Sequence, residues 1–207
     1  MQNPIYSRLL VAAAIVVSTA PAQADGQFYG RLSAGASTLS DPDVVGAISG
    51  EASFGTGQAF GGALGYDYAG SPFRSEIEYI YRTADADPFG GSGGGDLAST
   101  TVALNGYYDF ATAGSIAPYL GAGVGYATEI DFDIGSGTGE GEYSDTGIPM
   151  FQLMAGARYP INDRFSLTAE LRYFDAGSVT LVQSGGTGTL DLDYSGVEVS
   201  VGLQVSF

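Results

Sequence analysis

The chain has 207 residues, contains no Cys, His, Trp or Lys, and carries a formal net charge of −16. The missing His and Cys exclude Ser-His-Asp and Cys-His nucleophiles, disulfides, and metal sites built on imidazole or thiolate ligands. The acidic balance excludes an ordinary nucleic-acid-binding surface, which needs Lys and Arg to neutralise phosphates. With 44% hydrophobic and 12% aromatic residues, the chain is also too apolar for a disordered protein.

Residues 1–24 have the pattern of a secretory signal peptide. Arg8 precedes the apolar run 9–17, and Ala22-Gln23-Ala24 supplies a small-x-small cleavage site. The apolar run is shorter than the roughly 20 residues that a transmembrane helix needs. We therefore expect export, cleavage after Ala24 and a single domain over residues 25–207.

After the signal peptide, eight segments alternate with a period of two between apolar residues and polar or small ones. In the third segment, Phe73, Ile77 and Tyr79 share one face, whereas Arg74 and Glu76 share the other. This alternation is typical of β-strands with two different environments. The segments, in chain order, are 28–36, 60–68, 73–83, 101–110, 119–126, 151–159, 166–173 and 197–207.

The faces and connections of these segments indicate a membrane barrel. A strand that crosses a bilayer at a tilt needs about 9–11 residues, whereas soluble strands are commonly about 5–6. The polar faces combine Gly, Ala and Ser with a few Arg and Glu, as in the interior of a narrow barrel. We predict an all-β fold, an eight-stranded antiparallel up-and-down transmembrane β-barrel. The alternative, a soluble lipocalin-like barrel, would need an apolar interior.

Short and long connections alternate along the chain. Turns at 69–72, 111–115 and 160–163 are tight, whereas the connections at 38–56, 84–97, 128–147 and 175–194 are long and rich in Gly, Asp and Ser. Short periplasmic turns and long external loops are expected of a bacterial outer-membrane barrel. The glycine runs 90–95 and 135–141 are predicted to be flexible surface tips, since no Lys-Ser/Thr follows as in a phosphate-binding loop.

Aromatic residues gather at both ends of the predicted strands, as in the two interfacial belts of a membrane barrel. Those beside the short turns and the termini are Phe28, Tyr66, Tyr68, Phe73, Tyr108, Phe110, Tyr159, Phe165 and Phe207. Those beside the long loops are Tyr79, Tyr81, Tyr126, Phe151 and Tyr173.

Three motifs resemble known families of small outer-membrane barrels. The C-terminal segment 196–207 resembles the terminal-Phe strand that such barrels present to their assembly machinery, which implies that Phe207 is an assembly signal. The runs 117–126 and 153–161 resemble the opacity-type and outer membrane protein A-type barrels of the porin-family superfamily. These families include adhesins, surface antigens, narrow porins and structural barrels, so the resemblance implies the architecture more specifically than the function.

Ten charged residues point toward the barrel interior on this pattern, with Asp67 near its periplasmic rim. Unpaired buried charges are costly, so we expect these residues to form an ion-pair network. Two interpretations stay open: a plug that fills the barrel, or a narrow polar pore that opens when the pairs exchange partners. The ten residues are Arg31, Arg74, Glu76, Glu78, Arg82, Asp109, Arg158, Glu170, Arg172 and Glu198.

Catalysis is not expected from these residues. Glu76 and Glu78 share a face, as a catalytic carboxylate pair would, but neighbouring Arg residues would keep both ionised. The sequence suggests no substrate cleft beside them. We therefore predict no enzymatic activity, no catalytic residues and no cofactor.

The predicted long loops contain 15 acidic residues and no basic residue. Glu129, Asp131 and Asp133 alternate as some calcium ligands do, but the Gly and Glu of a calcium-binding hand are absent, and a charged strand extension is the alternative. Without Lys or Arg, these loops should contact lipopolysaccharide phosphates through divalent cations or not at all. We predict no metal site.

The sequence thus predicts an integral outer-membrane barrel of the structural or surface-antigen type. A narrow porin and an adhesin that acts through its loops are the alternatives. The expected partners are outer-membrane lipid and the barrel assembly machinery, with an unidentified extracellular partner possible in the adhesin case. We expect a monomer.

Overall fold

The computed structural model describes residues 26–207. The predicted signal peptide, 1–24, lies outside the described residues. Within 26–207, no helix is long and apolar enough to cross a membrane.

Eight long strands make up the body of the molecule. They form where the sequence alternates with a period of two, and each extends beyond the segment that the alternation predicted. They are β1 (Gly26–Leu39), β4 (Gly57–Tyr68), β5 (Phe73–Ala86), β6 (Gly95–Asp109), β7 (Ala117–Ile134), β9 (Ile148–Pro160), β10 (Phe165–Gln183) and β11 (Thr189–Ser206). Three short strands, β2 (Asp43–Gly46), β3 (Gly50–Glu51) and β8 (Gly141–Asp145), lie at one end.

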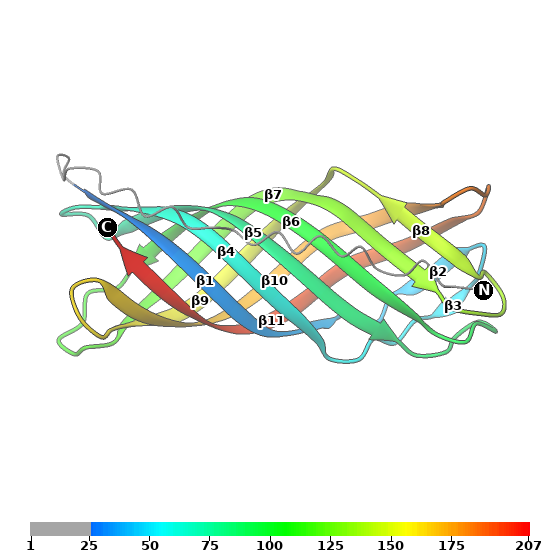
Figure 1. Cartoon of the computed structure of the whole chain (residues 1–207), viewed down its shortest axis with the longest axis horizontal. Helices are drawn as coiled ribbons and strands as arrows, with labels where there is room; N and C mark the ends of the chain where they lie inside the picture. The colour runs from blue at the N-terminus through cyan, green and yellow to red at the C-terminus, as the bar shows by residue number, and fades with distance from the viewer. Residues whose placement is uncertain (1–25) are drawn as a thin grey trace, which may run out of the picture.

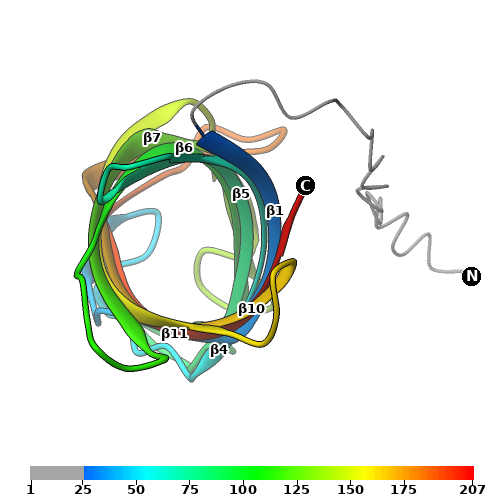
Figure 2. The same ribbon diagram turned by 90° about the vertical axis from the view of Figure 1, so that its left-hand side faces the viewer.

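The eight long strands form a closed antiparallel barrel. Each pairs with the next along the chain, with β7 passing directly to β9, and β11 returns to pair with β1 from Leu39–Gly196 to Tyr29–Ser206. The elongated cylinder and its closed ring of strands are visible in Figures 1 and 2. The predicted fold class is confirmed.

The outer surface carries an apolar band on the predicted strand faces. Leu32, Leu64, Ile77, Val124 and Val199 are all exposed on it. Aromatic side chains border the band at both ends and contact one another across strands, as in Phe73–Tyr108 and Phe151–Tyr173. The band therefore separates a short-turn end, which holds the C-terminus, from a long-loop end, which holds β2, β3 and β8 (Figure 1).

Two of the four predicted long loops, 128–147 and 175–194, are mostly strand, which corrects their boundaries. β7 continues to Ile134, β10 continues to Gln183 and β11 begins at Thr189. Only residues 184–188 connect β10 to β11. The glycine-rich tips also contact each other, since the Gly93 amide donates to the Ser136 carbonyl at 2.7 Å. The barrel wall thus extends well beyond the apolar band.

Two β-bulges change which residues face inward in this extension. The register of β7 against β6 shifts between Ala127 and Glu129, so that Thr128 is extra. Beyond this point Ile130, Phe132 and Ile134 are buried. Because side chains alternate across a strand, one extra residue moves the following residues to the opposite face. A second register shift in β10, between Asp175 and Ser178, does the same for Val179 and Leu181.

An apolar core therefore fills the interior at the long-loop end. The prediction of a polar interior is wrong for this part of the barrel, where apolar side chains from the strand extensions meet those of the loop containing β2 and β3. This apolar layer consists of Leu39, Val44, Ile48, Ala52, Phe54, Ala84, Ala86, Phe89, Leu97, Ala127, Ile130, Phe132, Ile134, Tyr143, Ile148, Met150, Phe174, Val179, Leu181, Leu190, Leu192 and Tyr194.

Candidate functional site

The structure brings the ten predicted interior charges together inside the barrel, on the short-turn side of the apolar layer. Every one of these Arg residues lies within 3.0 Å of a carboxylate oxygen. Asp67, which was placed near the rim, is also included, through Arg158 at 3.2 Å. We call these eleven residues and the polar side chains that bind them the ionic layer.

Glu78 on β5 lies at the centre of the ionic layer. Its Oε1 accepts from Arg31 and from Arg172, both at 2.9 Å, and its Oε2 accepts from Asn105 at 2.7 Å. Gln152 reaches the same oxygen at 3.3 Å. The donors come from β1, β6, β9 and β10, so one carboxylate ties together strands from all sides of the barrel. Its side chain is only 1% exposed.

Nearer the short turns, the ionic layer becomes partly exposed. Arg74 binds Asp109 through two nitrogens, Nε at 2.7 Å and Nη2 at 3.0 Å. Arg158 then joins Asp109 at 3.0 Å to Asp67 at 3.2 Å. The paired, bidentate geometry at Arg74 is the strongest arrangement available to a guanidinium and a carboxylate. This end of the network therefore meets solvent without leaving a charge unpaired.

Arg82 and Glu198 form the boundary with the apolar layer. Arg82 Nε donates to Glu198 at 2.9 Å, and Nη1 donates to Thr101 at 3.2 Å. Its third nitrogen, Nη2, makes no hydrogen bond among the described residues. Instead, the guanidinium lies over the Phe174 ring at 4.3 Å from the centroid, which gives a cation–π contact. The charged region thus ends against an aromatic side chain.

The ionic layer also has uncharged members, which the sequence-based prediction of ten charged residues did not include. Tyr29 donates to Glu76 at 2.8 Å, Tyr119 donates to Glu170 at 3.0 Å, and Gln152 donates to Asn105 at 2.6 Å. Tyr29, Asn105, Tyr119 and Gln152 all lie on the polar faces of their predicted strands, so the alternation could have identified them. A buried carboxylate needs more donors than the Arg residues supply, and these side chains provide them.

Outside the barrel, acidic residues face one another across the strand extensions. Asp133 on β7 lies opposite Glu142 on β8. Like charges directly opposite one another destabilise a sheet. Burial, followed by the charges of Asp133, Glu142 and Glu129, raises the pKa of Asp131 to about 6. Burial and Glu142 also raise the pKa of Asp133.

The alternating acids that resemble calcium ligands therefore lie on a charged strand extension, which is the alternative predicted for them from the sequence. Glu129, Asp131 and Asp133 all belong to β7, beyond the apolar band. Within residues 26–207, no group of three or more acidic side chains is arranged to hold a metal ion. Asp131 Oδ1 is buried and has no hydrogen-bond partner among the described residues, which agrees with the raised pKa of this carboxyl group.

A closed barrel with an apolar outer band, aromatic belts and a charged interior matches one family model. The model of the outer membrane protein beta-barrel domain covers residues 9–207. The chain belongs to this family. The protein is thus an outer-membrane β-barrel, and it resides in the cell outer membrane with its apolar band against lipid.

Individual relatives of this outer-membrane barrel agree with that assignment. Outer membrane protein PagN of Salmonella typhimurium is 28% identical over 149 residues, which are 62% of this chain and 62% of PagN. The chain thus spans less than two thirds of the length of this curated relative. Neisserial surface protein A is structurally similar, with a TM-score of 0.57 and 20% sequence identity. The alignment covers 87% of this chain and 97% of Neisserial surface protein A.

Outer membrane protein AlkL shares the same fold, with a TM-score of 0.52 and 17% identity. The alignment covers 92% of this chain and 96% of AlkL. In such barrels the short turns face the periplasm and the long loops face the exterior. The ionic layer therefore lies in the membrane-embedded part of the barrel, and the apolar layer lies in its extracellular extension.

Proposed function

We propose that the protein is a structural, surface-exposed barrel whose interior is sealed, and that it is neither a porin nor an enzyme. The observation that carries this proposal is the presence of two different fillings in series. The ionic layer occupies the membrane-embedded interior, with Glu78 and Arg172 each only 1% exposed. The apolar layer occupies the extracellular interior, with Phe132 and Phe174 fully buried.

The paired charges support a structural role better than a conducting one. A polar pore needs charges that face water, whereas Arg31 and Arg172 each form an ion pair with Glu78 at 2.9 Å. Removing one partner from a buried pair is strongly destabilising, so exchange of partners is costly. An apolar constriction in series is a further barrier to ions, since hydrophobic segments of a pore exclude water.

The acidic extracellular surface supports the surface role. The extensions of β7 and β11 present Glu129, Asp133, Asp191 and Asp193 outward, with no Lys or Arg on the predicted loops. Such a surface should repel free anionic partners and attract cations. An adhesin that acts through its loops is the alternative, and loop-deleted variants would test it.

We further propose that Phe207 serves as an assembly signal and that the barrel is a monomer in outer-membrane lipid. The Phe207 amide donates to the Phe28 carbonyl at 2.9 Å, so the last residue joins the closing seam beside β1. Its side chain is exposed, as recognition by assembly machinery requires.

Single-channel recording in planar bilayers tests the sealed interior. Purified protein whose gel mobility changes on boiling, the sign of an intact barrel, should give no discrete conductance steps. Regular steps that scale with salt concentration would replace the sealed barrel with a narrow porin. A known porin inserted in the same bilayers provides the positive control.

A further inference from the structure

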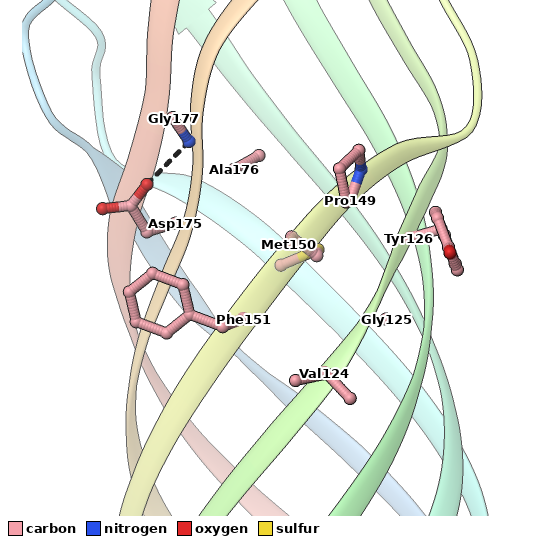
Figure 3. A pocket seen from close by; sticks show the side chains of 9 residues that line it. All are labelled: Val124, Gly125, Tyr126, Pro149, Met150, Phe151, Asp175, Ala176 and Gly177. Carbon is pink, nitrogen blue, oxygen red and sulfur yellow. Dashed lines mark hydrogen bonds between the residues drawn. The ribbon is translucent and has the colours of Figure 1, made fainter.

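One groove on the outer surface has no role in the sealed interior. It is a shallow, open depression with a volume of about 550 Å³. Three short segments line it: 124–126 of β7, 149–151 of β9 and 175–177 of β10. Figure 3 shows Phe151 and Tyr126 on opposite sides of β9, with Pro149 and Met150 between them.

The groove lies where the barrel wall is incompletely paired. β10 pairs with β9 up to Asp175–Phe151, and then with β8 only at Val182 and Gln183. Among the described residues, 176–181 of β10 thus have no ladder partner on this side. Pro149 has no amide hydrogen to offer, and the ladder between β10 and β9 ends at Asp175, directly before the bulge at Ala176 and Gly177.

The bulge is held in place by Asp175. One carboxylate oxygen accepts from the Gly177 amide at 2.7 Å (Figure 3), and the other accepts from the Tyr173 hydroxyl at 2.6 Å. Gly177 has a φ of 68°, which a residue with a side chain adopts only with strain. These contacts make the opening a built feature of the wall.

The position of the groove identifies its surroundings. Val124, Tyr126 and Phe151 belong to the apolar band and its outer aromatic belt, and they are 66%, 58% and 44% exposed. In an outer-membrane barrel, this surface is covered by the outer leaflet. The upper edge of the groove carries the unpaired backbone of β10, which cannot lie in hydrocarbon without hydrogen-bond partners. The groove therefore spans the boundary between acyl chains and headgroups.

We propose that this groove binds one acyl chain of an outer-leaflet membrane lipid, with the lipid's headgroup donors and acceptors meeting the open edge of β10. The chain would lie between the Tyr126 and Phe151 rings, over Pro149 and Ala176. Ala176, which packs against the apolar layer, would form part of the floor beneath the bound chain. The site depends on the outer-membrane location and not on whether the interior conducts.

The absence of Trp from the chain allows a clean test. Phe151→Trp places a single fluorophore in the groove, and Phe60→Trp places one on β4, in the same exposed outer region. Each variant is reconstituted in phosphatidylcholine vesicles, whose headgroup offers no hydrogen-bond donor, with increasing fractions of phosphatidylethanolamine carrying brominated chains, which quench Trp on contact. We expect the groove Trp to reach half-maximal quenching at a brominated fraction about fivefold lower than the control Trp.

A filling variant and a second probe make the test decisive. Val124→Phe, combined with Phe151→Trp, should abolish the difference, whereas Val199→Phe on the distant β11 wall should leave it unchanged. Identical quenching curves for the two Trp positions would reduce the groove to ordinary lipid contact and overturn the proposal. Saturation by free bromostearic acid with no saturation by the membrane lipid would also overturn it.

Discussion

At the centre of the barrel, Glu78 accepts hydrogen bonds from Arg31, Arg172, Asn105 and Gln152. Replacing it with Ala leaves two buried guanidinium groups short of a counter-charge. Breaking a buried pair in this way costs about 3–5 kcal/mol. We predict that Glu78→Ala lowers the urea midpoint at which the folded gel band disappears.

The matched control for this prediction is Glu51→Ala, which removes an exposed carboxylate from β3. It should leave the midpoint close to that of the wild type, since surface substitutions rarely exceed about 0.5 kcal/mol. Equal midpoints for the two variants would mean that the ionic layer does not stabilise the barrel.

Asp131 gives a prediction about pH. Its pKa in the folded protein is about 6, above its usual value of 3.8, because burial and then neighbouring acids oppose its charge. The folded state thus binds this proton more tightly than the unfolded state does. The charged carboxylate therefore destabilises the fold at neutral pH, and that cost fades as the pH falls from about 7 to about 4.

We expect Asp131→Asn to be more stable than the wild type at pH 7, by about 1 kcal/mol once solvent screening is allowed for. Urea unfolding at pH 7 and at pH 4 measures this, and the gap between the two proteins should close at the lower pH. Asp163→Asn, in a periplasmic turn, is the control. A gap that widens on acidification would refute the assigned direction.

At the level of elements, the β7 bulge determines which side chains fill the extracellular interior. Deleting Thr128 would turn Ile130, Phe132 and Ile134 outward and bring the neighbouring acids inward. We predict that this deletion abolishes the heat-modifiable gel band. Thr128→Ala should fold, because it keeps the residue count and loses only a hydrogen bond to the Thr100 carbonyl. A folded deletion variant would show that the bulge is dispensable.

The alternation predicted the membrane-embedded half of each strand, because there one face meets lipid and the other meets charges. Val197 to Val205 on β11 and Ile77 to Tyr81 on β5 are clear examples. The interior charges followed from the same pattern, since Arg and Glu on the opposite face had no other environment. The ion-pair partner of each charge could not be predicted, because it depends on the relative positions of strands across the barrel. The sequence of a single strand does not determine those positions.

The extracellular half was missed for two physical reasons. The acidic residues of 189–195 alternate with Leu190, Leu192 and Tyr194, a strand signal that the high content of Gly and Asp nearby obscured. In β7 and β10, the bulges reverse the inward face, so a pattern extrapolated from the membrane half gives the wrong face. The groove beside Phe151 adjoins the β10 bulge, so it could not be predicted from the alternation either.

At the scale of the whole molecule, the ionic and apolar layers act in series, so either should suffice to keep the barrel closed. Phe132→Ala with Phe174→Ala empties part of the apolar layer, and Glu78→Ala with Arg172→Ala empties part of the ionic layer without changing its net charge. We predict that neither pair alone produces conductance and that the four changes together do.

The measurement is single-channel recording, limited to preparations that keep the heat-modifiable band, since each Phe→Ala change costs about 3–5 kcal/mol. Steps from either double variant would show that the interior has one barrier and not two. A silent quadruple variant would mean that other side chains complete the closure.

The extracellular extension also has an immunological consequence. Its surface residues are presented by paired hairpins around a packed apolar core, with residues from β7, β8, β10 and β11 side by side. Antibodies should therefore recognise epitopes assembled from several hairpins and bind poorly to the corresponding linear peptides. Residues on the outside of these hairpins can vary without disturbing the core beneath them, which leaves the exposed surface free to diversify while the barrel stays intact.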